Sequence, residues 1–323
     1  MNPPGPRTAS TAAVVICTKD RPADLEQALA AVSADQPDCT LVVVDASSDG
    51  ATRQLLDRYR EAHPAMSVHY LAAARPGLVL QRNQAVAYCR GLNVQVVHFI
   101  DDDTEVLPGY FRAIEDSFRK DPGLGGVGGV IENNGPPPHR RIRSLFLLWC
   151  EAGSVLSSGW GVSHQYPGNE FGGRVEWLSG CSMSYRMCVF DVNSFDDRLA
   201  GFILGEDIDF SFRVSRRAQL AVEPAARCIH HLSPVSRRTP FRAGYERTVW
   251  RHAWVKEHRS EGMSLIAFWW STLGDACLLL GAAAIGPSRE SLAAAAGLVT
   301  GIRCVLIGRS CRTDGEAFGN PAG

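Results

Sequence analysis

The sequence lacks the closely spaced cysteines of a disulfide framework or a zinc site. Its ten cysteines are scattered between positions 17 and 311, and no two of them form a CxxC pair. Disulfide-rich secreted domains and structural zinc sites usually space their cysteines in compact patterns. We therefore expect free thiols in a reducing cytosol and no zinc site.

The chain also has little net charge and no apolar leader. The formal net charge is −1, which gives no indication of a nucleic-acid partner. The opening residues, MNPPGPRTAS, lack the apolar core of a signal peptide. We expect residues 1–11 to form a disordered tail, and we expect the catalytic part of the protein to be cytoplasmic.

Two glycine-rich signatures of phosphate binding are missing as well. The glycine-rich strand predicted at Leu124–Ile131 contains neither GK[ST] nor a GxGxxG that opens a helix, so a phosphate loop is not expected there. We expect its glycines to let neighbouring backbones approach closely. Residues 14–22 contain no glycine, whereas a sugar-phosphate nucleotidyltransferase should open with a GxGxR loop. This absence counts against that class of enzyme.

What the sequence does contain is an alternation of buried strands and helices. Pro22 fits the first turn of the first helix, and the polar turn 46–50 separates the second strand from its helix. Strand, helix, strand and helix at this spacing predict a Rossmann-like, doubly wound and mostly parallel α/β sheet. The expected early strands are Ala12–Thr18, Thr40–Asp45, Val68–Leu71 and Val96–Ile100, with a helix at Leu78–Arg90.

Three successive carboxylates, Asp101, Asp102 and Asp103, follow the strand that begins at Val96. Ligands of open α/β sheets bind beyond the carboxyl ends of the strands. Crowded carboxylates repel one another unless a cation or water offsets their charge, and Mg²⁺ or Mn²⁺ is the natural partner of such oxygen ligands. A solvated acidic turn is the alternative. A DxDxT phosphatase motif is excluded by Glu105, and a calcium EF-hand loop is excluded by Val106.

Other candidate binding residues lie at equivalent positions. Asp45 and Asp49 follow the second strand, where a ribose hydroxyl or a base edge could bind, although turn chemistry explains Asp49 equally well. Arg82 lies near the start of a helix, where a cation and backbone N–H groups could hold a diphosphate. An ordinary surface arginine is the alternative interpretation of Arg82.

A second acidic group, Glu206, Asp207 and Asp209, opens a predicted helix. Acidic residues stabilise helix N-termini through the helix dipole, so each could be structural. Three carboxylates within four residues exceed what helix capping requires. The last predicted strand, Val222–Ile229, ends in His230 and His231.

Residues 133–143 read as a loop in which three prolines precede Arg140, Arg141 and Arg143.

The C-terminal part has a different composition. Residues 236–323 are first basic, with Trp250 and Trp254 interleaved, and then apolar in two segments, 265–285 and 292–307. Such a region is typical of helices that lie in the inner-leaflet interface of a membrane. The alternatives are packing on the catalytic domain or across a dimer, and two membrane-spanning helices.

In this order the motifs resemble those of the family 2 glycosyltransferases, an inverting group with the GT-A fold. The resemblance covers residues 12 to about 235. It rests on VVICTKDRP, VVVDASSDG, RPGLVLQRN, IDDDTEV, WLSGCSMSYR, GEDIDFSFR and IHHLSP. It implies a GT-A catalytic domain at 12–235 followed by a membrane-associated helical region at 236–323.

The resemblance also implies roles for single residues. The donor nucleotide-sugar would be bound by Thr18 and Asp45 at the base and ribose, by Arg82 near the diphosphate, by Asp101 and Asp102 of the acidic motif, and by Gly180 and Cys181 near the sugar. The metal, Mn²⁺ or Mg²⁺, would be held by Asp103, Asp101 and His230, with His231 the less favoured histidine. Asp207 resembles the catalytic base, and Glu206 would orient the acceptor or the base.

These residue types suit an inverting transfer, which needs a carboxylate to take the acceptor's proton and a cation to stabilise the departing diphosphate. The expected enzyme is a glycosyltransferase of the hexosyltransferase type that acts on a lipid-linked or glycan acceptor in cell-surface polysaccharide or glycolipid synthesis. Its expected location is the cytoplasmic face of the cell membrane. No QxxRW motif follows the base, so we expect transfer of one or few sugars per encounter. A nucleotide-sugar-binding protein without transferase activity is the remaining alternative.

Overall fold

The computed structural model describes residues 12–150, 153–168, 173–199, 205–234, 239–286 and 288–308. The tail expected at 1–11 and the domain boundary expected after 235 lie outside these ranges. The chain forms two compact units, and each is described by itself. The first comprises the described residues of Met1–Pro136, Ser163–Asp197 and Phe210–Ser236, and the second those of Pro137–Val162, Arg198–Asp209 and Arg237–Gly323. The predicted division into domains at 12–235 and 236–323 stays a prediction.

The first unit is built on one mixed sheet. Its strands follow the order β3-β2-β1-β4-β8-β6-β9-β5, and β7 pairs with β9. Strands β3, β2, β1 and β4 pair in parallel, β6 and β9 also pair in parallel, and β8 runs against β4 and β6. The predicted mostly parallel sheet is therefore confirmed. The strands are β1 (Ala12–Thr18), β2 (Thr40–Asp45), β3 (Ser67–Ala72), β4 (Val96–Asp101), β5 (Thr104–Val106), β6 (Leu124–Ile131), β7 (Arg174–Val175), β8 (Ser182–Arg186) and β9 (Gln219–His230).

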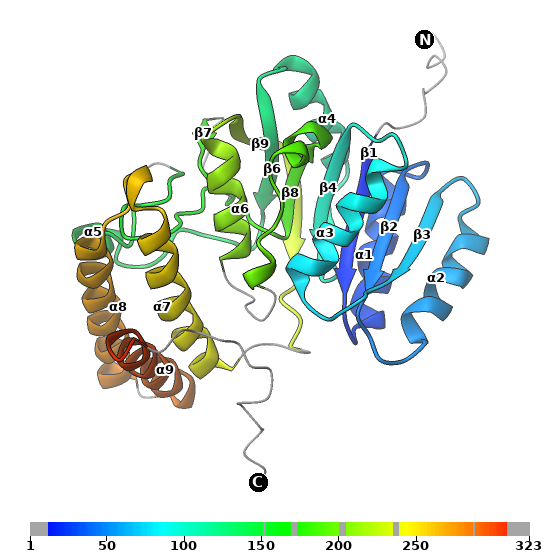
Figure 1. Ribbon diagram of the computed structural model, residues 1–323. Helices are drawn as coiled ribbons and strands as arrows, with labels where there is room; N and C mark the ends of the chain where they lie inside the picture. Colours follow the sequence, from blue (N-terminus) through cyan, green and yellow to red (C-terminus); the bar gives the residue numbers. More distant parts are fainter. Residues whose placement is uncertain are drawn as a thin grey trace. The chain divides into compact units, whose positions relative to one another are not determined.

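Helices cover both faces of this sheet, as expected for a doubly wound fold (Figure 1). Helices α1 (Pro22–Asp35), α2 (Ala51–Ala62) and α4 (Tyr110–Lys120) share one hydrophobic core with alternate residues of β1 and β2, such as Val14 and Val43. Helix α3 (Leu78–Arg90) packs against β1 and β2 with its own buried residues. Side chains of successive strand residues point to opposite faces, which is why these strands read as continuous apolar runs.

The glycines of β6 let backbones and side chains approach closely, as the sequence predicted. A Cβ atom at Gly126 would lie 2.7 Å from the Leu220 and Tyr185 side chains. A Cβ atom at Gly129 would lie 2.7 Å from the Ala226 carbonyl oxygen. Both distances are too short for a carbon atom, so β6 fits between β8 and β9 only without side chains at these positions.

Helices dominate the second unit. They are α5 (Arg140–Leu145), α7 (Pro240–Glu257), α8 (Leu265–Ile285) and α9 (Arg289–Leu306), and the boundary between the units falls within α6 (Glu206–Ser215). Three short 3-10 helices complete the described elements, η1 (Met187–Asp191), η2 (Asp197–Leu199) and η3 (Arg259–Glu261). The loop predicted at 133–143 is wrong over its last residues, because α5 begins at Arg140.

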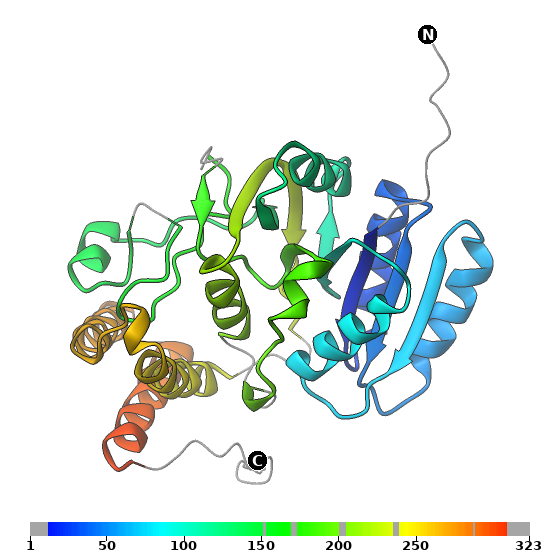
Figure 2. The ribbon, with the colours of Figure 1, turned by 45° about the horizontal axis from the view of Figure 1, so that its top comes forward.

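Helices α7, α8 and α9 pack together, and small residues bring α7 and α9 close (Figure 2). A Cβ atom at Gly297 of α9 would lie 1.9 Å from the Phe241 carbonyl oxygen of α7. Side chains cap the helix starts: Ser264 accepts a hydrogen bond from the Ala267 N–H at the start of α8. Among the described residues, one stretch, Leu265–Ala282, is long and apolar enough to cross a membrane.

Candidate active site

The acidic cluster lies where the chain leaves β4 and enters β5. Strand β4 ends at Asp101, and β5 pairs antiparallel with the end of β9, so that Thr104 faces His230. The His231 N–H donates to the Asp103 carbonyl oxygen at 2.9 Å. This pairing places the end of β9 beside the acidic turn, although the two segments are far apart in the sequence.

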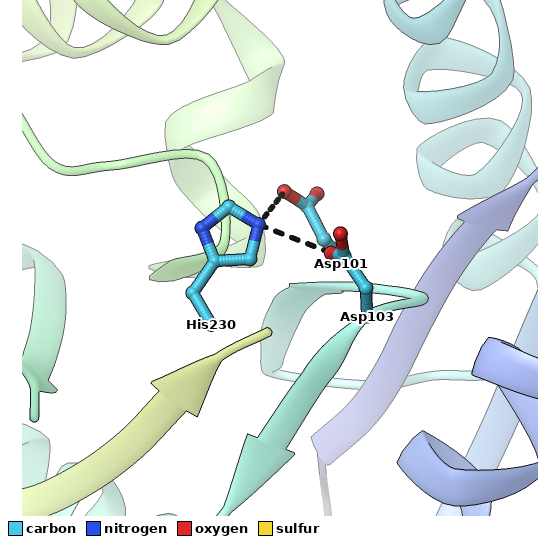
Figure 3. Close-up of side chains that lie close together, drawn as sticks. All are labelled: Asp101, Asp103 and His230. Carbon is cyan, nitrogen blue, oxygen red and sulfur yellow. Dashed lines mark ion pairs between the residues drawn. The ribbon is translucent and has the colours of Figure 1, made fainter. Parts of the chain in front are cut away.

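Asp101, Asp103 and His230 bring one ligand atom each to a common point (Figure 3). The His230 Nε2 atom lies 3.0 Å from the Asp103 Oδ1 atom and 3.8 Å from the Asp101 Oδ2 atom. All three ligand atoms lie within 4.8 Å of one another. The two carboxylates supply the oxygen ligands that suit Mn²⁺ or Mg²⁺, and the imidazole adds one nitrogen ligand.

The charges of this group are strongly coupled. Burial acts to raise the pKa of Asp103, but the hydrogen bond and charge of His230, with the Ser233 N–H and Arg21, lower it to about 2. Burial acts to lower the pKa of His230, but its hydrogen bonds to Asp103 and Cys181 raise it to about 11. Without a metal ion, the protonated imidazole therefore offsets part of the negative charge of the two carboxylates. Because a ligating histidine must be neutral, metal binding here requires release of that proton.

Asp102 is held differently from its two neighbours. Its Oδ2 atom accepts from the Thr18 hydroxyl at 2.6 Å, and its Oδ1 atom accepts from Arg21 Nη1 at 3.0 Å. Burial raises the pKa of Asp102 to about 7, although Arg21 and Thr18 oppose this effect. Asp102 thus fixes the ends of β1 and β4 to each other. Arg21, which also lies 3.5 Å from the Asp103 carboxylate, was not predicted from the sequence.

Two further residues that the sequence did not indicate orient the candidate metal ligands. The Ser233 N–H donates to the Asp103 Oδ2 atom at 2.8 Å. The Asn133 side chain donates to the His230 carbonyl oxygen at 2.7 Å and accepts from the His230 N–H at 3.1 Å. These bonds leave Asp103 Oδ1 and the imidazole ring directed at the common point. The signal for Asn133 would have been its place two residues after the end of β6, the strand that pairs in parallel with β9.

Arg82 links α3 to the acidic cluster. Its side chain is buried, Nη2 lies 3.5 Å from the Asp101 Oδ1 atom, and the same nitrogen donates to the Gly180 carbonyl oxygen at 3.3 Å. The surface interpretation of Arg82 is therefore wrong. Cys181 is buried beside Gly180, and burial raises the pKa of its thiol.

Asp45 lies at the end of the neighbouring strand, where it faces Thr18 in the parallel register. Its carboxylate accepts from the Ser47 N–H at 2.9 Å and from the Tyr70 hydroxyl at 3.2 Å. Asp49 accepts from the Ala51 N–H at 3.1 Å at the start of α2. That contact is the turn chemistry expected of an aspartate before a helix.

The second unit contains the other acidic group, at the start of α6. Asp209 is buried and accepts from Trp254 Nε1 at 3.0 Å, and His258 Nε2 lies 3.6 Å from the same carboxylate. Glu206 is also buried, whereas Asp207 is partly exposed and accepts from the Ile208 N–H at 2.8 Å. Asp209 therefore has a structural role, and Asp207 is the more accessible carboxylate.

Of the predicted site residues, the first unit brings most into one group. Asp45 is one strand away from that group, next to Thr18. Glu206 and Asp207 belong to the second unit. The residues that lie together are Thr18, Arg82, Asp101, Asp102, Asp103, Gly180, Cys181 and His230.

Several solved structures are similar in fold. The mannosyltransferase PcManGT from Pyrobaculum calidifontis, in complex with GDP-Man and Mn²⁺, is 19% identical with a TM-score of 0.56, over 94% of this chain and 83% of that one. Residues 1–349 of S. aureus TarS are 14% identical with a TM-score of 0.52, over 87% and 76% of the two chains. GalNAc-T7 with UDP, GalNAc and Mn²⁺ is 17% identical with a TM-score of 0.51, over 70% of this chain but only 44% of that one.

At these identities the similarity shows the fold alone, which is that of the GT-A glycosyltransferases. A search of the curated protein sequences gave no match. The sequence profile described as "Glycosyl transferase family 2" matches residues 13–196, which is more than half of the chain and includes the acidic turn and Arg82. The chain belongs to glycosyl transferase family 2 and is a glycosyltransferase.

Proposed function

We propose that the protein is a metal-dependent, inverting transferase that moves a sugar from a nucleotide-diphospho-sugar to a hydroxyl group of a lipid-linked or glycan acceptor. The proposed setting is the synthesis of cell-surface polysaccharide or glycolipid. The observation that supports it is the Asp101–Asp103–His230 group, whose three ligand atoms converge at the carboxyl end of β4.

These residues fit Mn²⁺ or Mg²⁺. The donor set is two carboxylates and one imidazole, and Ser233 and Asn133 hold the ligands in place from outside. Mn²⁺ is also present in the similar structures of PcManGT and GalNAc-T7. A bound ion would supply positive charge to the leaving diphosphate. Asp103 and His230 would hold the ion directly, and Asp101 would complete the group.

The remaining residues of the group are proposed to bind the donor. Arg82 is a buried cation beside Asp101, where it would contact a diphosphate bound at the same point. Thr18 and Asp45 end neighbouring strands and would contact the base and ribose, with Asp102 fixing Thr18. Gly180 and Cys181 would lie near the donor sugar.

Asp207 is proposed to be the general base, with Glu206 beside it to orient the acceptor or the base. An inverting transfer is one in-line displacement in which the acceptor hydroxyl attacks the anomeric carbon and its proton passes to a carboxylate. The attacking oxygen forms the new glycosidic bond while the bond to the diphosphate oxygen breaks. Asp207 suits this role because it is partly exposed, whereas the Asp209 carboxylate is bound by Trp254 and His258.

The test compares Asp207→Asn, Glu206→Gln and Asp209→Asn. A panel of nucleotide-sugars that includes GDP-mannose is first screened for an Mn²⁺-dependent rise in unfolding temperature. The nucleotide-sugar that gives the largest rise is used as the donor. We expect Asp207→Asn to keep the unfolding temperature and donor binding but to lose about 10²–10⁴-fold in turnover, the usual contribution of a general base.

Asp209→Asn should lower the unfolding temperature but keep most of the turnover, because it weakens the contacts to Trp254 and His258 without removing the proton acceptor. Glu206→Gln should have an intermediate effect on turnover. If Asp207→Asn keeps more than about a tenth of the activity, against that expected loss, Asp207 is not the base.

A further inference from the structure

Helix α8 has an apolar face that the described protein leaves uncovered. Ile266 and Leu273 are 85% and 52% exposed, and Trp270 and Leu280 are exposed on the same side. Positions 266, 270, 273 and 280 recur at helical spacing and so form one stripe along α8. Only 33% of the apolar stretch Leu265–Ala282 is buried. The opposite side of α8, with Phe268 and Thr272, packs within the unit.

Helix α5 contacts α8 at this stripe. The Trp270 Nε1–H donates to the Leu145 carbonyl oxygen at 2.8 Å, and the Phe146 and Trp270 rings lie 5.0 Å apart. A Cβ atom at Gly274 would lie 2.3 Å from Phe146, so the absence of a side chain at Gly274 makes room for that ring. Leu145, which is 65% exposed, therefore extends the apolar stripe onto α5.

The exposed charge beside the stripe is positive. Arg140 and Arg141 of α5 are exposed, and Arg143 is partly exposed and donates to the Pro138 carbonyl oxygen. Helix α5 contains no acidic residue, and the one charged residue of α8, Asp275, is buried 3.6 Å from Arg247. Apolar side chains and exposed arginines thus share this surface, and neither helix carries an exposed acidic residue.

The described part of the basic stretch, residues 239–259, does not form the exposed apolar surface of α8. Arg251 is buried between the rings of Trp160 and Phe268, at 4.9 and 5.0 Å from their centroids. Trp250 and Trp254 of α7 are also buried. Both tryptophans pack inside the second unit and so are not part of the exposed face of α8.

We propose that α5 and the outer face of α8 form a docking surface for a membrane that contains anionic lipids. We call this surface the lipid-facing patch, and it consists of Arg140, Arg141, Ile142, Leu145, Ile266, Trp270 and Leu273. Its apolar side chains enter the boundary between headgroups and acyl chains, and its arginines contact lipid phosphates and carboxylates. Helix α8 lies along the interface and does not cross it, because its inner face and Asp275 are engaged inside the unit.

The lipid-facing patch rests on the proposed function in one respect: a lipid-linked acceptor would be reached at the membrane surface to which the patch binds. The binding itself is independent of catalysis. The experiments therefore measure vesicle binding and donor hydrolysis in the same proteins. A variant that loses vesicle binding but still hydrolyses the donor supports the patch, whereas failure of the wild-type protein to hydrolyse any donor bears only on the proposed function.

The charge test uses co-sedimentation of the full chain with phosphatidylcholine vesicles, with and without phosphatidylserine. We expect the wild-type protein to bind the vesicles that contain phosphatidylserine more tightly. Arg140→Glu/Arg141→Glu should lower that affinity by about 30-fold or more, since each arginine near an anionic surface contributes a factor of about five. The matched control, Arg58→Glu/Arg112→Glu, reverses two exposed charges of the first unit and should bind as the wild type does.

The apolar test compares Leu273→Asn with Val192→Asn, which removes a 64% exposed side chain from the first unit. Leu273→Asn should lower vesicle affinity by about fivefold, the value of burying roughly half a leucine side chain, and Val192→Asn should leave it unchanged. Equal binding of both vesicle types, or unchanged binding of the Arg140/Arg141 variant, would overturn the proposal. The proposal would also be overturned if the wild-type protein did not bind vesicles but formed dimers that Leu273→Asn disrupts, because the patch would then bind a second copy of the chain.

Discussion

At the scale of single residues, the site depends on how tightly its buried groups are confined. Arg82 is buried, contacts Asp101, and packs so closely on Gly180 that a Cβ atom there would lie 2.8 Å from Arg82 Nη2. Any side chain at position 180 must therefore displace the guanidinium. That displacement would move the cation that we propose for the donor diphosphate.

Gly180→Ala should accordingly reduce both stability and donor binding. We expect the free energy of unfolding to fall by about 1–3 kcal/mol, the usual cost of inserting a methyl group into a packed interior. Gly50→Ala is the matched control, because the nearest atom to a Cβ there is 3.8 Å away. Denaturant unfolding and calorimetric titration with the donor measure the two effects. A Gly180→Ala protein as stable as the Gly50→Ala protein would show that Arg82 yields freely.

The sequence predicted the members of the site that are recognisable by residue type. Asp101, Asp103 and His230 were candidates because carboxylates and an imidazole are metal ligands, and the structure brings them together. Arg21 and the Ser233 N–H were not, although both contact Asp103. A backbone donor has no signature in a sequence, and an arginine becomes informative only when its carboxylate partner is known.

At the scale of elements, the three-residue strand β5 determines where His230 lies. It pairs Thr104 with His230 and Val106 with Cys228 at the end of β9. Such a short segment has no periodicity to detect, so the sequence indicated only a turn after the aspartates. The register that brings Asp103 beside His230 was therefore not predictable, although the acidic turn and the histidine were both predicted as site residues.

Asn133→Ala should weaken metal binding without removing a ligand. The Asn133 side chain forms two hydrogen bonds with the His230 backbone, and groups that orient metal ligands typically contribute about 10–100-fold to affinity. We expect a loss of about tenfold in Mn²⁺ affinity by calorimetry. Asn134→Ala changes the adjacent exposed residue and should bind Mn²⁺ normally. Equal affinities for the two variants would show that β5 alone positions His230.

Longer elements were predicted well because their signals are local and repeated. The bounds of β1, β2, α3 and β6 agree with the expected ones, since each has a continuous buried run or a clear helical period. Helix α5 was missed because its composition, arginine-rich and directly after three prolines, is typical of a loop. It is held by contacts to Trp270 and Gly274, which are distant in the sequence.

At the scale of the whole molecule, the two compact units contribute different parts of the proposed chemistry. The first contains the metal group and the proposed donor-binding residues, and the second contains Asp207 and the lipid-facing patch. The mostly parallel sheet could be predicted because its strands alternate with helices along the chain. The grouping of residues 137–162 with the C-terminal helices could not, because it depends on contacts between distant segments.

In the mechanism proposed above, Asp101, Asp103 and His230 bind a divalent ion that the enzyme needs to hold a nucleoside diphosphate. Calorimetric titration of UDP and GDP, with and without Mn²⁺, tests it most directly on wild-type, Asp103→Asn and Asp20→Asn proteins. Asp20→Asn is the control, because Asp20 is an exposed residue with a φ of 58°, which asparagine also adopts readily.

We predict that Mn²⁺ strengthens binding of one of these diphosphates to the wild-type and Asp20→Asn proteins. In the presence of Mn²⁺, Asp103→Asn should bind the diphosphate about 100-fold or more weakly than the wild type does. This loss is at least as large as that expected for a residue that only orients a metal ligand. Asp103→Asn should still fold, because Asn can accept the Ser233 hydrogen bond, but its unfolding temperature should fall because the charge contact to His230 is lost. A Mn²⁺-dependent affinity that is the same in Asp103→Asn as in the wild type would contradict the metal site and, with it, the proposed mechanism.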